Sequence, residues 1–182
     1  ELLGTILIIS VIVSMSTILK ESGISEVMIA PFGKLIKTPT HAYWIIGILM
    51  MIISFFFWPS PAVALIGAVM LPIAIKAGLP ALGVAMAMNL FGHGIALSGD
   101  YIIQGAPRLT SDAAGIPIGD VMTASVPLVI VMGVVTTVLA FIFLKRDLKK
   151  GNLSIKDGDH KVVEDDSKLK NILSPKTKKV LA

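Results

Sequence analysis

The chain has 182 residues, of which 54% are hydrophobic and 15% charged, and its mean hydropathy is +0.85. Soluble domains carry about 25% charged residues, so this composition excludes an ordinary soluble protein and predicts an all-α integral membrane protein. The lack of cysteine excludes disulfides and thiol chemistry. The excess of lysine and arginine lies in residues 145–182, eleven against six acidic residues, so nucleic-acid binding is not expected.

The first expected element is a transmembrane helix over residues 1–19, because Leu2 to Leu19 carries no charge. The sequence begins inside this apolar run without an initiator Met, so we expect the chain to be the C-terminal part of a longer membrane protein. In residues 20–40 apolar side chains recur at spacings of three and four. This pattern predicts an amphipathic helix at the membrane interface, with a structured loop as the alternative.

Residues 41–78 are predicted to form a helical hairpin with its tip at residues 58–62, Trp-Pro-Ser-Pro-Ala. The two prolines remove backbone donors and disfavour helical conformation at the residues before them. Each arm is short for a span of about 20 apolar residues. Unpaired backbone at membrane depth is tolerated only inside protein or beside a watery cavity. These features favour a re-entrant hairpin, and a loop between two short spans is the alternative.

Residues 79–107 are predicted to form an interrupted helix, since three glycines lie between residues 92 and 99. Asn89, His93 and Asp100 are four and seven residues apart, so they would share one face of a continuous helix. Ionisable groups inside a membrane are functional candidates, and histidine can titrate near neutral pH. The alternatives are packing roles for the asparagine and the histidine, and a solvated helix end for the aspartate.

The remaining elements are an extracytoplasmic loop at 108–120, a transmembrane helix at 121–144 and a basic, mostly disordered tail at 145–182. The last of these helices has 24 residues without a charge. Lysines gather at one end of the expected helices, whereas Arg108 lies with two aspartates at the other. The positive-inside rule then predicts a multi-pass protein of the inner cell membrane with a cytoplasmic tail.

In this order of elements, residues 2–144 resemble one inverted repeat of the ion-transporter superfamily of secondary carriers. That superfamily includes citrate, dicarboxylate and gluconate permeases and some sodium/proton antiporters. The resemblance implies an interfacial arm helix that links a scaffold to a moving transport domain. It also implies a substrate and ion site between the hairpin tip and the break, here Gly92 through Asp100. The Ser-Asn-Thr tip of dicarboxylate carriers is replaced in this chain by Pro59-Ser60-Pro61.

From this resemblance we expect Ser60, Asn89 and Ser98 to contact the substrate, and Asp100 and His93 to couple transport to H⁺ or Na⁺. The helix ends of such a site suit the two ligands, since free amide groups attract an anion and unwound carbonyls coordinate a cation. No catalytic residue, resident metal or cofactor is expected beyond the coupling ion.

The predicted function is secondary transport of a small organic anion. Cation/proton antiport and a non-catalytic membrane subunit are the alternatives. The expected partners are the lipid bilayer, a small-molecule anion or cation, the missing N-terminal half and a second copy in a homodimer. Proteolysis is disfavoured, because residues 96–100 approach two intramembrane protease patterns without a nucleophile–base pair or a second intramembrane aspartate.

Overall fold

The computed structural model describes residues 35–155, 159–161 and 163, together with residues 14, 18 and 31. Every regular element in this part of the chain is a helix, which confirms the all-α class. The helix expected at 1–19 and most of the interfacial helix expected at 20–40 lie outside the described residues. The helices are α3 (Pro39–Phe57), α4 (Pro59–Lys76), α5 (Ala81–Met88), π-helix η1 (Asn89–Ala96), α6 (Leu97–Gly99), α7 (Gly105–Ala114) and α8 (Ile118–Lys150).

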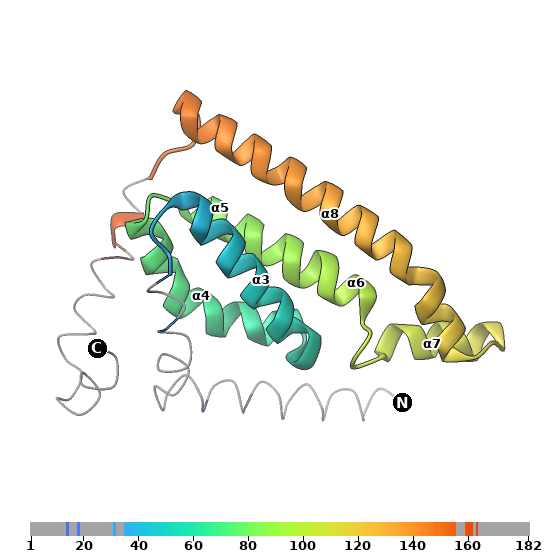
Figure 1. Ribbon diagram of the computed structural model, residues 1–182. Helices are drawn as coiled ribbons and strands as arrows, with labels where there is room; N and C mark the ends of the chain where they lie inside the picture. Colours follow the sequence, from blue (N-terminus) through green and yellow to red (C-terminus); the bar gives the residue numbers. More distant parts are fainter. Residues whose placement is uncertain are drawn as a thin grey trace.

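Helices α3 and α4 form an antiparallel pair that reverses direction at Trp58 (Figure 1). Oγ1 of Thr38 accepts a hydrogen bond from the backbone N–H of His41 at 3.2 Å and so caps the start of α3. Helix α3 has 19 residues, which rise about 28 Å. That length is close to the hydrocarbon core of a bilayer, about 30 Å. The re-entrant form of the hairpin therefore stays a prediction, beside two full spans.

Residues 81–99 form one continuous helix, within which the eight residues of η1 are wound as a π-helix. The sequence predicted a break from Gly92 through Asp100; in the structure residues 92–99 stay helical, and the helix is interrupted between Asp100 and Gln104, before α7 begins at Gly105. The wider turns of the π-helix take up the glycines while the backbone stays helical and hydrogen-bonded, as an apolar interior requires. The helix ends at Asp100, which has left-handed backbone angles of φ 41 and ψ 40.

The core lies between α3, α4 and the helix over 81–99. Glycines allow α3 and η1 to approach closely, as small residues do at membrane helix interfaces. A Cβ atom at Gly47 would lie 2.5 Å from Cδ2 of Phe91, and one at Gly92 would lie 2.7 Å from Cε of Met50. The largest fully buried side chains are Tyr43, Ile46, Met50, Ile66, Met70, Leu79 and Val84.

The structure also differs from the sequence prediction after residue 100. The expected loop at 108–120 is mostly helical, because α7 covers its first part and α8 begins at Ile118. Helix α8 runs through the expected start of the tail to Lys150, where Gly151 ends it at φ 72. Lysine and arginine are good helix formers and are favoured at the C-terminal end of a helix. Residues 159–161 and 163 also have helical backbone.

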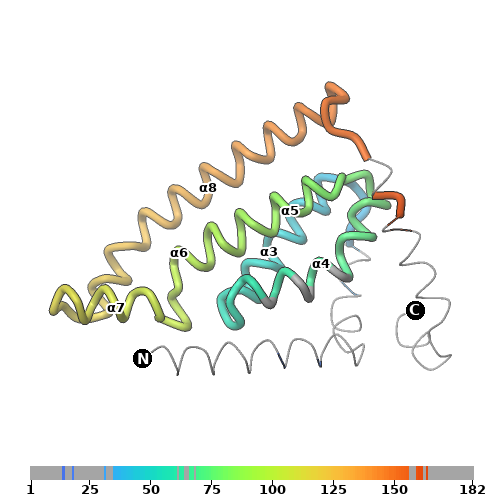
Figure 2. The backbone as a smooth tube through the Cα atoms, turned by 180° about the vertical axis from the view of Figure 1, so that it is seen from behind, coloured from blue at the N-terminus to red at the C-terminus, as the bar shows by residue number. Residues whose placement is uncertain are grey.

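Helix α8 lies along the outside of the bundle, and its N-terminal part extends beyond the hairpin tip (Figures 1 and 2). The hydroxyl of Tyr43 donates to the backbone oxygen of Thr137 at 3.0 Å, and the hydroxyls of Tyr101 and Ser125 lie 3.2 Å apart. Much of the rest of α8 is apolar and exposed. Together with α3 and the helix over 81–99, it is long and apolar enough to cross a membrane.

The hydrogen bond between Tyr43 and α8 leads to a first expected result. Tyr43→Phe keeps the ring, which packs against Trp44, Phe91 and Phe141, and removes only the hydroxyl. Hydrogen bonds between membrane helices contribute about 0.6 kcal/mol on average, so thermal unfolding in detergent should occur at a slightly lower temperature. Tyr101→Phe, which alters a less buried bond, should have a smaller effect. Equal stability of Tyr43→Phe and the parent protein would contradict this role.

Candidate functional site

The hairpin tip lies beside the segment where the helix over 81–99 ends (Figures 1 and 2). A Cβ atom at Gly105 would lie 3.8 Å from Cζ2 of Trp58 and 3.4 Å from Oδ2 of Asp100. Trp58 has φ 53 and ψ 149, a conformation that costs a bulky residue about 1–3 kcal/mol and that gathers at functional sites. The reversal at Trp58 and the segment of residues 100–104, which links α6 to α7, therefore meet at one end of the bundle.

Asp100 is held by backbone amides at this meeting point. Its side chain is 6% exposed, so the solvated position considered from the sequence is not what the structure shows. Oδ1 accepts the N–H of Gln104 at 3.1 Å, and Oδ2 accepts the N–H of Ala106 at 3.0 Å. The carboxylate thus satisfies donors at the N-terminus of α7, the end of a helix that favours negative charge.

Three polar side-chain atoms of α3, Trp58 and η1 are buried and have no hydrogen-bond partner among the described residues. They are Oγ of Ser54, Nε1 of Trp58 and Nδ1 of His93. Ser54 and Trp58 are four residues apart at the end of α3, and Oγ of Ser54 would lie 3.1 Å from a Cβ atom at Gly92. Buried polar groups are nearly always paired, and each unpaired one costs about 1–3 kcal/mol. These atoms are therefore candidates for hydrogen bonds to a group outside the described residues.

The residues predicted from the sequence to form the site are not all gathered there. Ser60 lies in the first turn of α4, Asn89 begins η1 and Ser98 lies in α6, and all three are exposed. No hydrogen bond joins any two of them in the described part of the chain. Of the two residues expected to couple transport to an ion, Asp100 lies near the tip residue Trp58, and His93 has a buried Nδ1.

Sequence reasoning missed Ser54 and Trp58 as candidate ligands. One signal was present, because Ser54 is the single hydroxyl residue between Trp44 and Trp58. A lone hydroxyl in such an apolar run, one helical turn from a tryptophan that precedes a proline, favours a polar face at the end of α3. The part of η1 that lies against Ser54 gives no such signal in the sequence, because the residue there is Gly92, which has no side chain.

Comparison with known proteins gives a consistent assignment. Residues 2–182 match the family model of the C4-dicarboxylate anaerobic carrier, DcuC. Over 150 residues the chain is 65% identical to the "Uncharacterized membrane protein YhfA" of Bacillus subtilis (strain 168). This match covers 82% of the chain and 32% of the relative, so the chain spans about a third of the relative's length. No solved structure matches. The protein therefore belongs to the C4-dicarboxylate anaerobic carrier family of membrane proteins.

Proposed function

We propose that the chain is part of a secondary transporter that moves a C4-dicarboxylate across the membrane together with H⁺ or Na⁺. The name of the family supports the substrate class. We also propose that the complete transporter has an N-terminal half outside these 182 residues, which the coverage of about a third of the relative supports. The resemblance to one repeat of the ion-transporter superfamily supports a site at the hairpin tip.

The observation that carries this proposal is the indole N–H of Trp58. It is buried at the tip without a partner among the described residues, and an indole nitrogen can only donate a hydrogen bond. It therefore requires an acceptor, which a substrate carboxylate supplies. The hydroxyl of Ser54 and the imidazole of His93 can donate as well. A set of donors suits a dicarboxylate better than a bare cation, so the geometry favours an anion carrier over a cation/proton antiporter.

The start of α4 adds a second attraction for an anion. The first turn of a helix presents backbone N–H groups and positive dipole charge. Pro59 and Pro61 lack this donor, so Ser60 and Ala62 supply the N–H groups nearest the tip. We propose that Ser60 contacts one carboxylate there through its hydroxyl and backbone, and that Asn89 and Ser98 line the path to the site.

Ion coupling is assigned to Asp100 and His93 in this proposal. The two oxygens of an ionised carboxylate can accept about four hydrogen bonds or ligands in total. Each oxygen of Asp100 accepts one backbone N–H, from Gln104 just before α7 and from Ala106 in its first turn. The remaining capacity can take a proton or Na⁺. An ion bound at Asp100 next to the tip would stabilise a dicarboxylate bound there, which links the two binding events.

The test replaces Trp58 by phenylalanine in the full-length protein and measures uptake of labelled succinate into proteoliposomes under an inward H⁺ or Na⁺ gradient. Trp58→Phe keeps an aromatic ring and removes the N–H. A hydrogen bond to a charged group contributes about 1.5–3 kcal/mol, which corresponds to a roughly ten- to hundredfold rise in KM. The matched control is Trp44→Phe, the same change at a half-buried ring that packs against Phe91 and Phe141.

Succinate uptake by the parent protein with an unchanged KM in Trp58→Phe would contradict the assignment of the tip. An equal rise in KM for Trp44→Phe would show that the ring change acts through packing. Gradient-driven cation exchange without any dicarboxylate uptake would replace the proposal by the antiporter alternative.

A further inference from the structure

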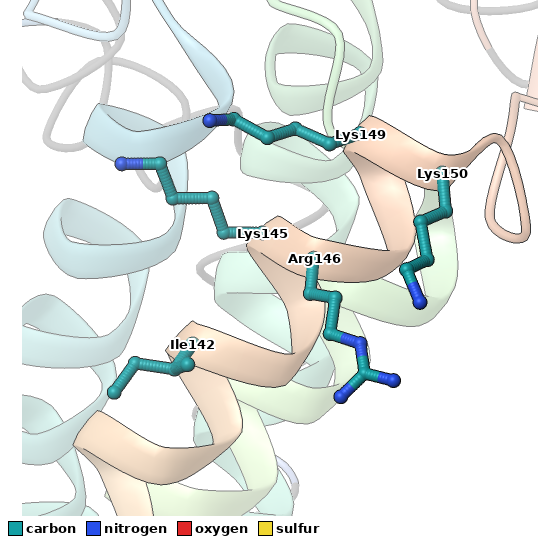
Figure 3. Close-up of a pocket in the computed structure, with 5 residues that line it drawn as sticks. All are labelled: Ile142, Lys145, Arg146, Lys149 and Lys150. Carbon is teal, nitrogen blue, oxygen red and sulfur yellow. The ribbon is translucent and has the colours of Figure 1, made fainter.

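The C-terminal end of α8 carries a shallow, open basic hollow, where Lys145 and Lys149 extend to one side of the helix and Arg146 and Lys150 to another (Figure 3). It is lined by Lys145, Arg146, Lys149 and Lys150, together with the apolar side chain of Ile142. Its volume is about 360 Å³, whereas one water molecule occupies about 30 Å³ in the liquid. The hollow is therefore large enough for a polar headgroup.

The cations of the hollow face away from the protein core. All four are exposed, whereas Leu144 and Leu148 of the same helix pack against the core. Asp147 does not line the hollow, and its Oδ1 accepts the side-chain amide of Asn152 at 3.3 Å. The lining thus combines four positive charges with one apolar side chain.

The helix dipole alone does not account for this cluster. Carbonyl groups at a helix C-terminus favour cations within the last turn, where Lys149 and Lys150 lie. Lys145 and Arg146 lie a turn earlier, beside Ile142, where the apolar part of the helix ends. The hollow therefore stands where an apolar surface changes into a cationic one.

An apolar stripe leads into the hollow along one face of α8. Val135, Val138 and Ile142 precede Lys145 and Lys149 at steps of three and four residues, so all five share a face. The three apolar side chains are 46%, 38% and 51% exposed. A molecule that fits both regions has a negative headgroup and a hydrocarbon tail.

We infer that the hollow binds the phosphate of an anionic phospholipid whose acyl chains lie along this stripe. Lysine and arginine form charge-assisted hydrogen bonds to phosphate oxygens, and basic clusters beside a transmembrane helix attract anionic lipids. The inference does not depend on the transported substrate.

The test measures lipid binding to the full-length protein by native mass spectrometry. Phosphatidylglycerol should bind at least roughly tenfold more tightly than phosphatidylcholine with the same acyl chains, and glycerol 3-phosphate at equal concentration should not displace it. The preference should disappear when glutamine replaces each cation of the hollow. The control variant loses the same charge from the tail, with glutamine at Lys170, Lys176, Lys178 and Lys179.

Three results would overturn the inference. Equal binding of the two lipids to the parent protein would show that the hollow and its apolar stripe are covered by protein or do not select anionic lipids. An equal loss of preference in the tail variant would assign binding to net charge. Displacement by glycerol 3-phosphate would show that the hollow takes a free phosphate ester. Thermal unfolding of both variants should match the parent protein, since all four substituted residues in the hollow are exposed.

Discussion

Asp100→Ala is expected to lower the stability of the protein strongly, whereas Asp100→Asn should retain most of it. The carboxylate of Asp100 accepts two backbone N–H groups before and within the first turn of α7, and each bond to a charged group contributes about 1.5–3 kcal/mol. In Asp100→Ala the N–H of Gln104 keeps a bond to the backbone oxygen of residue 100, at 3.0 Å in the parent protein. The N–H of Ala106 loses its acceptor, the carboxylate. Asparagine keeps one acceptor oxygen, which can take the N–H of Ala106 while the N–H of Gln104 keeps the backbone oxygen, whereas alanine leaves the N–H of Ala106 without an acceptor.

The same pair of variants separates the structural role of Asp100 at the start of α7 from its proposed coupling role. Asp100→Asn removes the charge with little change in volume, so it should abolish accumulation of succinate against a gradient while the folded protein stays in the membrane. Exchange of internal for external succinate, which needs no net ion flow, can survive this change. The measurements are thermal unfolding in detergent and both kinds of flux in proteoliposomes.

Each outcome for Asp100 has a distinct meaning. Concentrative uptake by Asp100→Asn at the level of the parent protein would refute the coupling role. Asp100 would then serve only to accept the backbone N–H groups at the start of α7. Equal stability of Asp100→Ala and the parent protein would show that the bonds from Asp100 to the start of α7 do not stabilise the fold. Asp112→Asn, an exposed aspartate within α7, is the control for the loss of one negative charge in this region.

Gly47→Ala is expected to destabilise the protein although alanine is the better helix former. The new Cβ atom would lie 2.5–2.9 Å from three carbon atoms of the Phe91 ring, including Cγ at its base. The ring is 4% exposed and packs edge-on against Tyr43 and Trp44, so it cannot turn away freely. Overpacking of this kind costs about 1–3 kcal/mol, which should appear as a lower unfolding temperature.

The matched control is Gly119→Ala, because a Cβ atom there would meet nothing within 4 Å. Both glycines lie in α-helices, and the replacement favours the helix by about 1 kcal/mol where space is free. Gly119→Ala should therefore leave the unfolding temperature unchanged or raise it slightly. If Gly47→Ala behaves in the same way, the close approach of α3 and η1 is not needed for stability.

The sequence predicts the helical hairpin and the final apolar helix well, because both depend on local chemistry. Prolines at 59 and 61 mark the reversal, and the 24 uncharged residues at 121–144 mark the helix. It predicts the path of the chain after Gly92 poorly. Glycine weakens an α-helix, but the same residues also permit π-helical turns, and packing against α3 decides between these outcomes.

The candidate site was predictable in outline only. Ionisable residues stand out in an apolar sequence, which therefore indicates Asp100 and His93. The pairing of Asp100 with the N-terminus of α7 depends on a helix that the sequence does not indicate. Ser60, Asn89 and Ser98 were chosen as polar residues near expected breaks, and the structure places them on exposed surface. The lone hydroxyl of Ser54 is a weak sequence signal, whereas the burial of Ser54 and of the Trp58 indole nitrogen is a property of the folded chain.

The length of α8 makes this protein sensitive to bilayer thickness. Its 24 uncharged residues rise about 36 Å, which exceeds a hydrocarbon core of about 30 Å. Such hydrophobic mismatch is relieved when the helix tilts or the bilayer thickens locally. Helix α8 is joined to α3 through Tyr43 and Thr137, and Ile95 of η1 packs beside Gly133. We therefore expect a change in membrane thickness to act on α3 and η1, which carry buried polar atoms that have no partner among the described residues.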